Sequence, residues 1–282
     1  MNLSSSRCLC YLLFNLCLSS LQTALAQPGA AVAPFVDDQT LVVARIDLRQ
    51  LDPTALVATL GKLAPPDDAR FAQQLAGLEQ KSKQLLAALT QLGVQEMYAV
   101  VSLADSPKEP LFVVAPLTAG GESRQAADGL RQLLRFEAAD ARLGVAVVGK
   151  SATIERLKTL QPAARPDFAR GFERAGNAAL QVVVAPSDDT RRVLREMLPR
   201  LPDEIGGGSG KTLADGVQWA TLSVEAPPRL SLSVVIQSRD AEAATALRGT
   251  IVSGLQFLAR MPDLRQRWPQ RSHTRELYDA RT

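Results

Sequence analysis

The sequence predicts an α+β protein made of two tandem ferredoxin-like (βαββα) modules, with antiparallel sheets covered by helices and the second module incomplete. Three observations lead to this prediction. Short stretches alternate apolar and polar residues, longer stretches repeat apolar residues every three or four positions, and the same order of elements occurs twice along the chain.

The first predicted module extends from residue 27 to residue 162. Its first strand, TLVVARIDL, places Arg45 and Asp47 on one face and apolar residues on the other. After a helical stretch, EMYAVVSL and LFVVAPL form a hairpin around a turn that contains prolines. A helix from Ser123, the strand LGVAVVG and the helix SATIERLKTL complete this module.

The second predicted module, residues 163–264, repeats the order with the strand ALQVVVAP, the helix SDDTRRVLREMLPRL, a hairpin of GVQWATLSVEA and RLSLSVVIQS, and a helix from Asp240. Leu232 and Val234 face one way and Ser231 and Ser233 the other, which is typical of an antiparallel sheet with one covered and one wetter face. No later stretch matches LGVAVVG, so we expect the second module to be incomplete.

Two long helices carry apolar stripes, which we expect to cover the sheets. The first stripe comprises Phe71, Leu75, Leu78, Leu85, Leu89 and Leu92, and the second comprises Leu247, Ile251, Leu255, Leu258 and Met261. A stripe of this kind can also bind a partner helix, but packing on the chain's own sheet is the commoner use.

The first 26 residues predict a secretory signal peptide. Arg7 precedes a short apolar run, and the small residues Ala24 and Ala26 mark a cleavage site after Ala26. A membrane anchor is the weaker alternative, because the run is shorter than the roughly 20 apolar residues that cross a bilayer. The protein is therefore expected in the periplasm or outside the cell.

The cysteines support a core without disulfides. Cys8, Cys10 and Cys17 all lie inside the predicted signal peptide, so the mature chain contains none. This excludes thiol nucleophiles, thiolate metal sites and redox pairs from the mature protein.

The formal charge of +3 is concentrated in the C-terminal tail. Residues 265–282 contain five arginines against Glu276 and Asp279, and the rest of the mature chain is close to neutral. A near-neutral body argues against nucleic-acid binding. We predict that the tail is disordered, and its arginines offer a contact for an envelope protein or a polyanionic surface.

The segment GGGSGKT, Gly206 to Thr212, is similar to a phosphate-binding loop. The loop pattern requires a glycine where this chain has Ile205. The predicted context is also reversed, because a helix precedes the segment and a strand follows it. We interpret it as a flexible connector, and no cofactor is predicted.

No catalytic or metal-binding set is predicted. His273 is the single histidine and lies in the tail, which excludes a histidine triad and a multi-histidine metal site. Asp37, Asp38 and Asp47 are weak candidates for a carboxylate-dependent hydrolase. Asp37 and Asp38 also suit a turn, whereas Asp47 has no local explanation except a pairing with Arg45 or with a residue of the next strand.

The stretch PFVDDQTLVVARIDLRQLDP resembles the start of α+β modules in uncharacterised bacterial exported proteins. The resemblance implies an envelope or secreted location and carries no catalytic residues. The leading hypothesis is a non-enzymatic exported protein that acts in binding or envelope assembly. The alternative is a carboxylate-dependent hydrolase of the periplasm or extracellular space.

Overall fold

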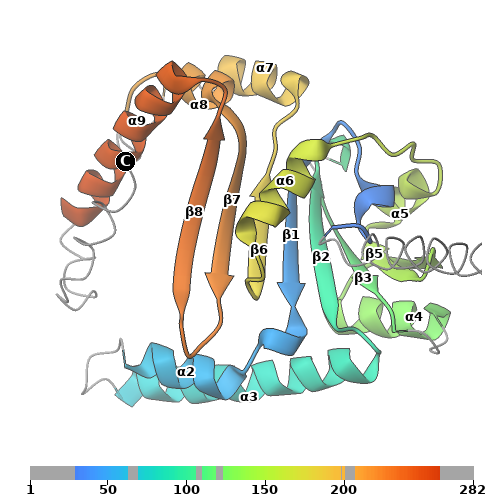
Figure 1. The fold of residues 1–282 in the computed structure, drawn as a ribbon. Coiled ribbons are helices and arrows are strands. Elements are labelled where there is room, and N and C mark those ends of the chain that lie inside the picture. The colour runs from blue at the N-terminus through green and yellow to red at the C-terminus, as the bar shows by residue number, and fades with distance from the viewer. Residues whose placement is uncertain are drawn as a thin grey trace, which may run out of the picture.

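A computed structural model of the protein describes residues 29–62, 69–105, 110–118, 123–197, 199–200 and 207–260. The fold is α+β, with one eight-stranded antiparallel sheet in the order β4-β5-β3-β2-β1-β6-β7-β8 (Figure 1). The predicted signal peptide and the arginine-rich tail lie outside the described residues.

The first half of the chain follows the predicted order with one addition. Its elements are η1 (Ala33–Phe35), β1 (Thr40–Asp47), η2 (Leu48–Gln50), α2 (Pro53–Gly61), α3 (Ala69–Gln91), β2 (Glu96–Ser102), η3 (Leu103–Asp105), β3 (Leu111–Pro116), α4 (Ser123–Leu134), β4 (Ala138–Arg142), β5 (Val145–Gly149) and α5 (Ser151–Lys158). The β2–β3 hairpin is confirmed. Strand β4 was not predicted, and the turn that joins it to β5 uses positive φ angles at Leu143 and Gly144.

The second half also follows the predicted order. Its elements are α6 (Pro166–Ala175), β6 (Leu180–Val184), α7 (Asp188–Met197), α8 (Gly210–Gly216), β7 (Val217–Glu225), β8 (Ser231–Ser238) and α9 (Ala241–Arg260). The β7–β8 hairpin is confirmed. Helix α8 was not predicted, because its sequence, GKTLADG, has glycine at both ends and no apolar period.

The ferredoxin-like arrangement is not confirmed. A split βαβ unit leaves room for another strand between the two strands that its helix connects. Here β1 pairs directly and antiparallel with β2, and its other edge pairs with β6. The two halves therefore share one sheet instead of forming a sheet each.

One face of the sheet is well covered. Helices α5 and α6 and the turn η1 pack on it, as Figure 1 shows for α6, which crosses the middle strands. The largest buried side chains of this core include Phe35, Tyr98, Phe112, Phe172 and Leu157. The opposite face is covered beside β3, β4 and β5, where Ala127 and Leu130 of α4 join a second core cluster.

The long helices do not lie flat on the sheet as expected. Helices α2 and α3 run along one end of the strands, and α7 and α8 lie at the opposite end (Figure 1). In α3, Leu89 is buried, but Leu78 and Leu85 are 47% and 42% exposed. The predicted covering role of this stripe is wrong for its first half, because α3 packs on α2 at the strand ends.

Helix α9 packs mainly on α8 and also contacts β8. Leu247 is buried against Gly216 of α8, whereas Ile251, the next residue of the predicted stripe, is exposed. The side chains of Leu255 and Leu258, and the whole of Met261, lie outside the described part of the chain.

Candidate functional site

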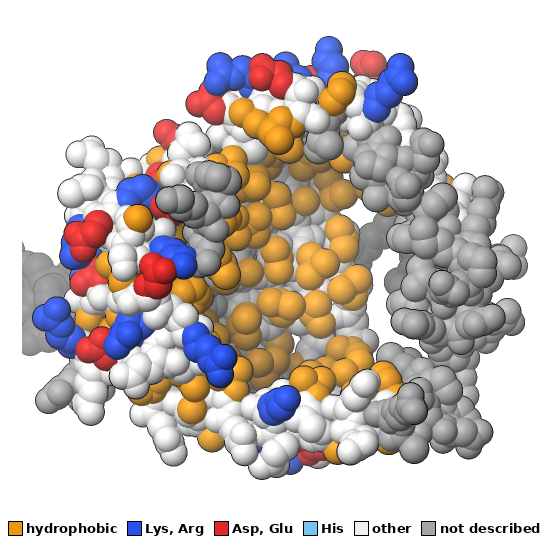
Figure 2. All heavy atoms as spheres, turned by 180° about the vertical axis from the view of Figure 1, so that it is seen from behind, with side chains coloured by type: hydrophobic (Ala, Val, Ile, Leu, Met, Phe, Trp, Pro, Cys, Tyr) orange, Lys and Arg blue, Asp and Glu red, His pale blue; other side chains and the backbone are white. Residues whose placement is uncertain are grey.

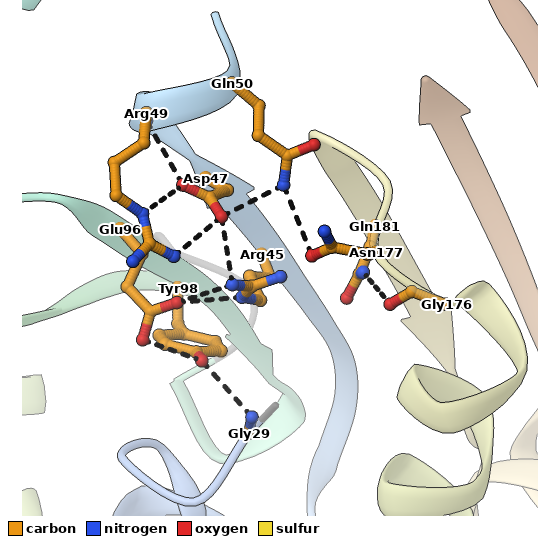
Figure 3. Close-up of polar contacts among 10 residues, drawn as sticks. All are labelled: Gly29, Arg45, Asp47, Arg49, Gln50, Glu96, Tyr98, Gly176, Asn177 and Gln181. Atoms are coloured by element: carbon orange, nitrogen blue, oxygen red, sulfur yellow. Dashed lines mark hydrogen bonds and ion pairs between the residues drawn. The ribbon is translucent and has the colours of Figure 1, made fainter. Parts of the chain in front are cut away.

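Asp47 lies at the end of β1 and has a structural role. Its carboxylate accepts hydrogen bonds from Arg49 Nη2 at 2.8 Å, Arg49 Nε at 2.9 Å and Gln50 Nε2 at 3.0 Å (Figure 3). It also accepts from the backbone N–H of Arg49, which fixes the start of η2, and from Arg45 Nη2 at 3.3 Å. Both carboxylate oxygens are therefore fully used by the chain itself.

The predicted pairing of Asp47 with Arg45 is confirmed as part of a larger network. Arg45 also contacts Glu96 of β2, at 2.8 Å from Nη2 to Oε2, and Tyr98 donates a hydrogen bond to Glu96. Glu96 and Tyr98 were not identified from the sequence, because their positions opposite Asp47 and Arg45 depend on the β1–β2 register.

The hydrogen bonds from Arg49 lower the pKa of Asp47 from 3.8 to about 2, although burial opposes this shift. A carboxylate with this pKa stays ionised and is a poor proton donor or acceptor near neutral pH. Together with the saturation of its oxygens, this identifies Asp47 as an anchor of the fold.

The other two candidate carboxylates lie at the opposite end of β1. Asp37 accepts hydrogen bonds from Thr40 Oγ1 at 2.8 Å and Arg156 Nη1 at 2.9 Å, and Asp38 is exposed. A strand of this length separates its two ends by roughly 24 Å. Glycosidase carboxylates lie within about 10 Å of each other. The structure does not bring the three candidates together.

The glycine-rich segment is partly a helix start. Ser209 caps α8 by accepting a hydrogen bond from the backbone N–H of Lys211, and Gly210 is buried where α8 packs on α7 and α9. The expectation of a plain connector is therefore wrong for Gly210 to Thr212, while Gly206 lies outside the described residues. The segment follows α7, whereas a phosphate loop follows a strand.

We expect Lys211→Ala to leave the free energy of unfolding within about 0.5 kcal/mol of wild type, because the Lys211 side chain is exposed. Denaturant unfolding measures this. The matched change Ser209→Ala removes the cap and should cost about 1 kcal/mol. An equal loss in both variants would show that Lys211 has a structural role that its exposure does not reveal.

The most distinctive surface is an open apolar area of the sheet. Three rows of side chains cross the five strands β2, β1, β6, β7 and β8, and every member is aliphatic or methionine. The rows are Val101, Val42, Val184, Ala220 and Ile236; Ala99, Ala44, Val182, Leu222 and Val234; and Met97, Ile46, Leu180, Val224 and Leu232. We call these residues the aliphatic face.

Figure 2 shows the aliphatic face as the floor of a hollow. None of its residues is fully buried, and Leu232 and Val234 are 67% and 55% exposed. Strand spacing gives the floor a size of roughly 19 Å across the strands and 14 Å along them. At one end of the strands, Leu85 of α3 is 42% exposed and continues the apolar surface beside Leu180 and Val224.

A pocket opens at one end of this floor. It has a volume of about 310 Å³ and lies between helices α2 and α3 and the ends of β6 and β7. Leu180 and Val224 belong to both the aliphatic face and the pocket, and Leu56, Leu85 and Leu89 supply the opposite wall. The floor therefore leads without a break into a pocket with mostly apolar walls.

The sequence marked this face but assigned it the wrong environment. The alternation in β8 predicted that its apolar residues lie on a covered side and its serines on a wetter side. In the structure Leu232 and Val234 are exposed, whereas the charges of Arg45, Asp47 and Glu96 on the opposite face of the sheet compensate one another beneath the segment that begins at Gly29. On the aliphatic face, no described helix lies over the four strands β1, β6, β7 and β8 (Figure 2).

Within the described ranges, no three or more histidine, cysteine, aspartate or glutamate side chains gather in a way that would hold a metal ion. No helix in the same part of the chain has the length and apolar character needed to cross a membrane.

Comparison of the chain with protein-family models, with curated proteins and with solved structures gives no match. The proposed function therefore rests on the aliphatic face and its pocket alone.

Proposed function

We propose that this protein is an exported, non-enzymatic binding protein that holds a fatty acyl chain on its aliphatic face. The observation that carries the proposal is the uninterrupted aliphatic composition of three rows across five strands, in a hollow open to solvent. Apolar patches of this extent on a single chain mark interaction sites, because exposing them to water is unfavourable.

The chemistry of the floor favours an acyl chain over a protein partner. Surfaces that bind proteins are enriched in aromatic residues and arginine, which provide directional contacts. The aliphatic face has no aromatic or charged side chain and no side-chain hydrogen-bond donor. It can recognise only aliphatic matter, and each buried methylene contributes about 0.8 kcal/mol.

The pocket beside the floor supports the same ligand class. Its volume of about 310 Å³ falls at the lower end of the range for small-molecule sites. Asp52 and Glu225 are the charged residues of its lining, and the remaining wall is mainly leucine. One end of a chain fits between α2 and α3, while the rest lies along the floor.

The predicted export supports a role in the cell envelope. A signal peptide directs the protein to a compartment bounded by lipid, and a mature chain without cysteine needs no oxidative folding there. The resemblance of PFVDDQTLVVARIDLRQLDP to exported proteins agrees with this location.

Titration of the purified protein with a dansyl-labelled fatty acid tests the proposal. We expect saturable fluorescence enhancement that unlabelled oleate reverses. Leu222→Glu places a charge in the middle row of the floor and should weaken binding at least tenfold, about 1.4 kcal/mol. A lysophospholipid competitor then shows whether the source of the chain is a free fatty acid or a lipid.

Leu143→Glu is the matched control, because Leu143 is 73% exposed in the β4–β5 turn, outside the aliphatic face. It should bind the probe like wild type. If Leu222→Glu fails to fold, Leu232→Glu replaces it at a position that is already 67% exposed. Equal probe binding by wild type and a folded face variant would refute the proposed site.

A further inference from the structure

The two halves of the sheet are related by an internal two-fold repeat. The order of β1, α2, α3, β2, β3 and α4 is repeated by β6, α7, α8, β7, β8 and α9. The central strands β1 and β6 pair antiparallel, with Ala44 opposite Val182. Outward from this pair, Ala99 corresponds to Leu222, and Val113 of β3 corresponds to Val234 of β8.

The corresponding valines have different environments. Val113 is 8% exposed, because it packs in the second core cluster with Ala127 and Leu130 of α4, and β5 pairs with the outer edge of β3 and places Val148 beside it. Val234 is 55% exposed, and no described strand pairs with the outer edge of β8. Within the described residues, the second half therefore lacks the neighbouring strand that completes the first half.

Strand β8 has none of the usual protection of a free edge. Its sequence, SLSVVIQS, contains no charge and no proline over eight residues. The other edge strand, β4, has five residues and carries Asp140 and Arg142. Free edges are normally blocked by short length, charge or proline, so β4 is protected and β8 is available for pairing.

Helix α9 leaves most of this edge accessible. It turns away after Ser238 and packs on α8 through Leu247, and all four residues from Ser231 to Val234 are exposed. The chain beyond α9 has a poor sequence for a strand, since residues 261–282 contain Pro262, Pro269 and five arginines without an apolar alternation.

We propose that β8 pairs antiparallel with β8 of a second copy of this chain, centred on Val234. This register places Leu232 opposite Ile236 of the other copy and keeps the aliphatic faces of both copies on one side. A single strand that pairs with itself in this way gives a closed two-fold dimer and leaves neither β8 edge free. The result is one continuous sheet with a shared aliphatic floor.

Sedimentation velocity of the full protein, purified after its natural processing, tests this pairing. We expect the wild type at twice the monomer mass. Ser233→Lys puts a charge on the free edge, on the face opposite the aliphatic one, and should give a monomer with an unchanged far-UV circular dichroism spectrum. Ser223→Lys is the matched control, because Ser223 is the β7 residue directly opposite Ser233, one strand further from the edge, and this variant should remain dimeric.

A cysteine at the two-fold position tests the register. In Val234→Cys the two copies place their Cα atoms about 5 Å apart, within the range of a disulfide. Copper phenanthroline should therefore give a covalent dimer with this variant and not with the unsubstituted protein. A monomeric wild type, a dimer that persists in Ser233→Lys, or absence of the covalent dimer would each overturn the proposal. Fatty-acid binding by a monomer would overturn the pairing and leave the proposed function standing.

Discussion

Replacing Asp47 by alanine is expected to lower the free energy of unfolding by about 3 kcal/mol. Asp47 is 2% exposed and accepts hydrogen bonds from three side chains and one backbone N–H. Removing one member of a buried ionic network leaves its partners uncompensated, and Arg45, itself 6% exposed, would keep only Glu96. Denaturant unfolding, with the midpoint and slope measured separately, gives the change.

Two control variants distinguish the stability lost with the buried network from the stability lost when any charged side chain is removed. Asp47→Asn preserves the shape but turns an NH₂ group toward the donors, so we expect a loss of about 2 kcal/mol. Glu155→Ala removes an exposed ion pair with Lys158 and should cost less than about 0.5 kcal/mol. If Asp47→Ala costs no more than Glu155→Ala, the network does not anchor the fold.

The pKa of Asp47 also gives a pH dependence. Because the pKa is lowered to about 2 in the folded protein, ionisation stabilises the fold above about pH 4, by about 2 kcal/mol. This contribution is lost as the pH falls from about 4 to about 2. The stability difference between wild type and Asp47→Asn should therefore narrow over that interval and remain constant above it.

Replacing Gly171 by alanine is expected to destabilise the protein by about 2 kcal/mol. A Cβ atom at Gly171 in α6 would lie 2.4 Å from Cγ1 of Val183, which is fully buried in β6. Separating helix and strand costs about 3 kcal/mol, and the better helix propensity of alanine returns about 1 kcal/mol. Thermal and denaturant unfolding of the variant measure the net effect.

Gly77→Ala in α3 is the matched control, because apart from its chain neighbours and the backbone of its own helix no atom lies within 4 Å of the added Cβ. It should stabilise the protein by up to about 1 kcal/mol. The double variant Gly171→Ala with Val183→Ala removes the clashing methyl groups and should lose less stability than the two single changes added together. Strict additivity would mean that the two residues are not in contact.

The order of the elements could be predicted from the sequence, because alternation and helical spacing are local patterns. The β7–β8 hairpin and α4 are examples. Strand β4 was missed because AADAR is short and has no β-branched or large apolar residue, and its pairing with β5 decides its structure. Helix α8 was missed because its cap and its packing on α7 and α9 outweigh the poor helix propensity of its glycines.

The candidate site shows a second limit of prediction from sequence, which concerns the environment of a strand face. The alternation in β8 indicated correctly which residues share a face, but the environment of that face depends on contacts distant in the sequence. The alternation in β1 placed Asp47 and Arg45 together opposite the apolar residues, and they are buried there because Glu96, Arg49 and Gln50 neutralise and solvate them in place of water. Only the assembled sheet shows that the apolar side remains open.

The pairing of β1 with β6 makes the halves depend on each other. Each of these two central strands pairs with the edge that the other would otherwise leave free. The ladder has five pairs of residues, from Val42 opposite Val184 to Ile46 opposite Leu180. Without β1, strand β6 would present a free edge, LQVVV, that carries no charged residue, and such an edge favours aggregation. Although the order of elements repeats along the chain, the ladder between β1 and β6 joins both halves into one cooperative unit.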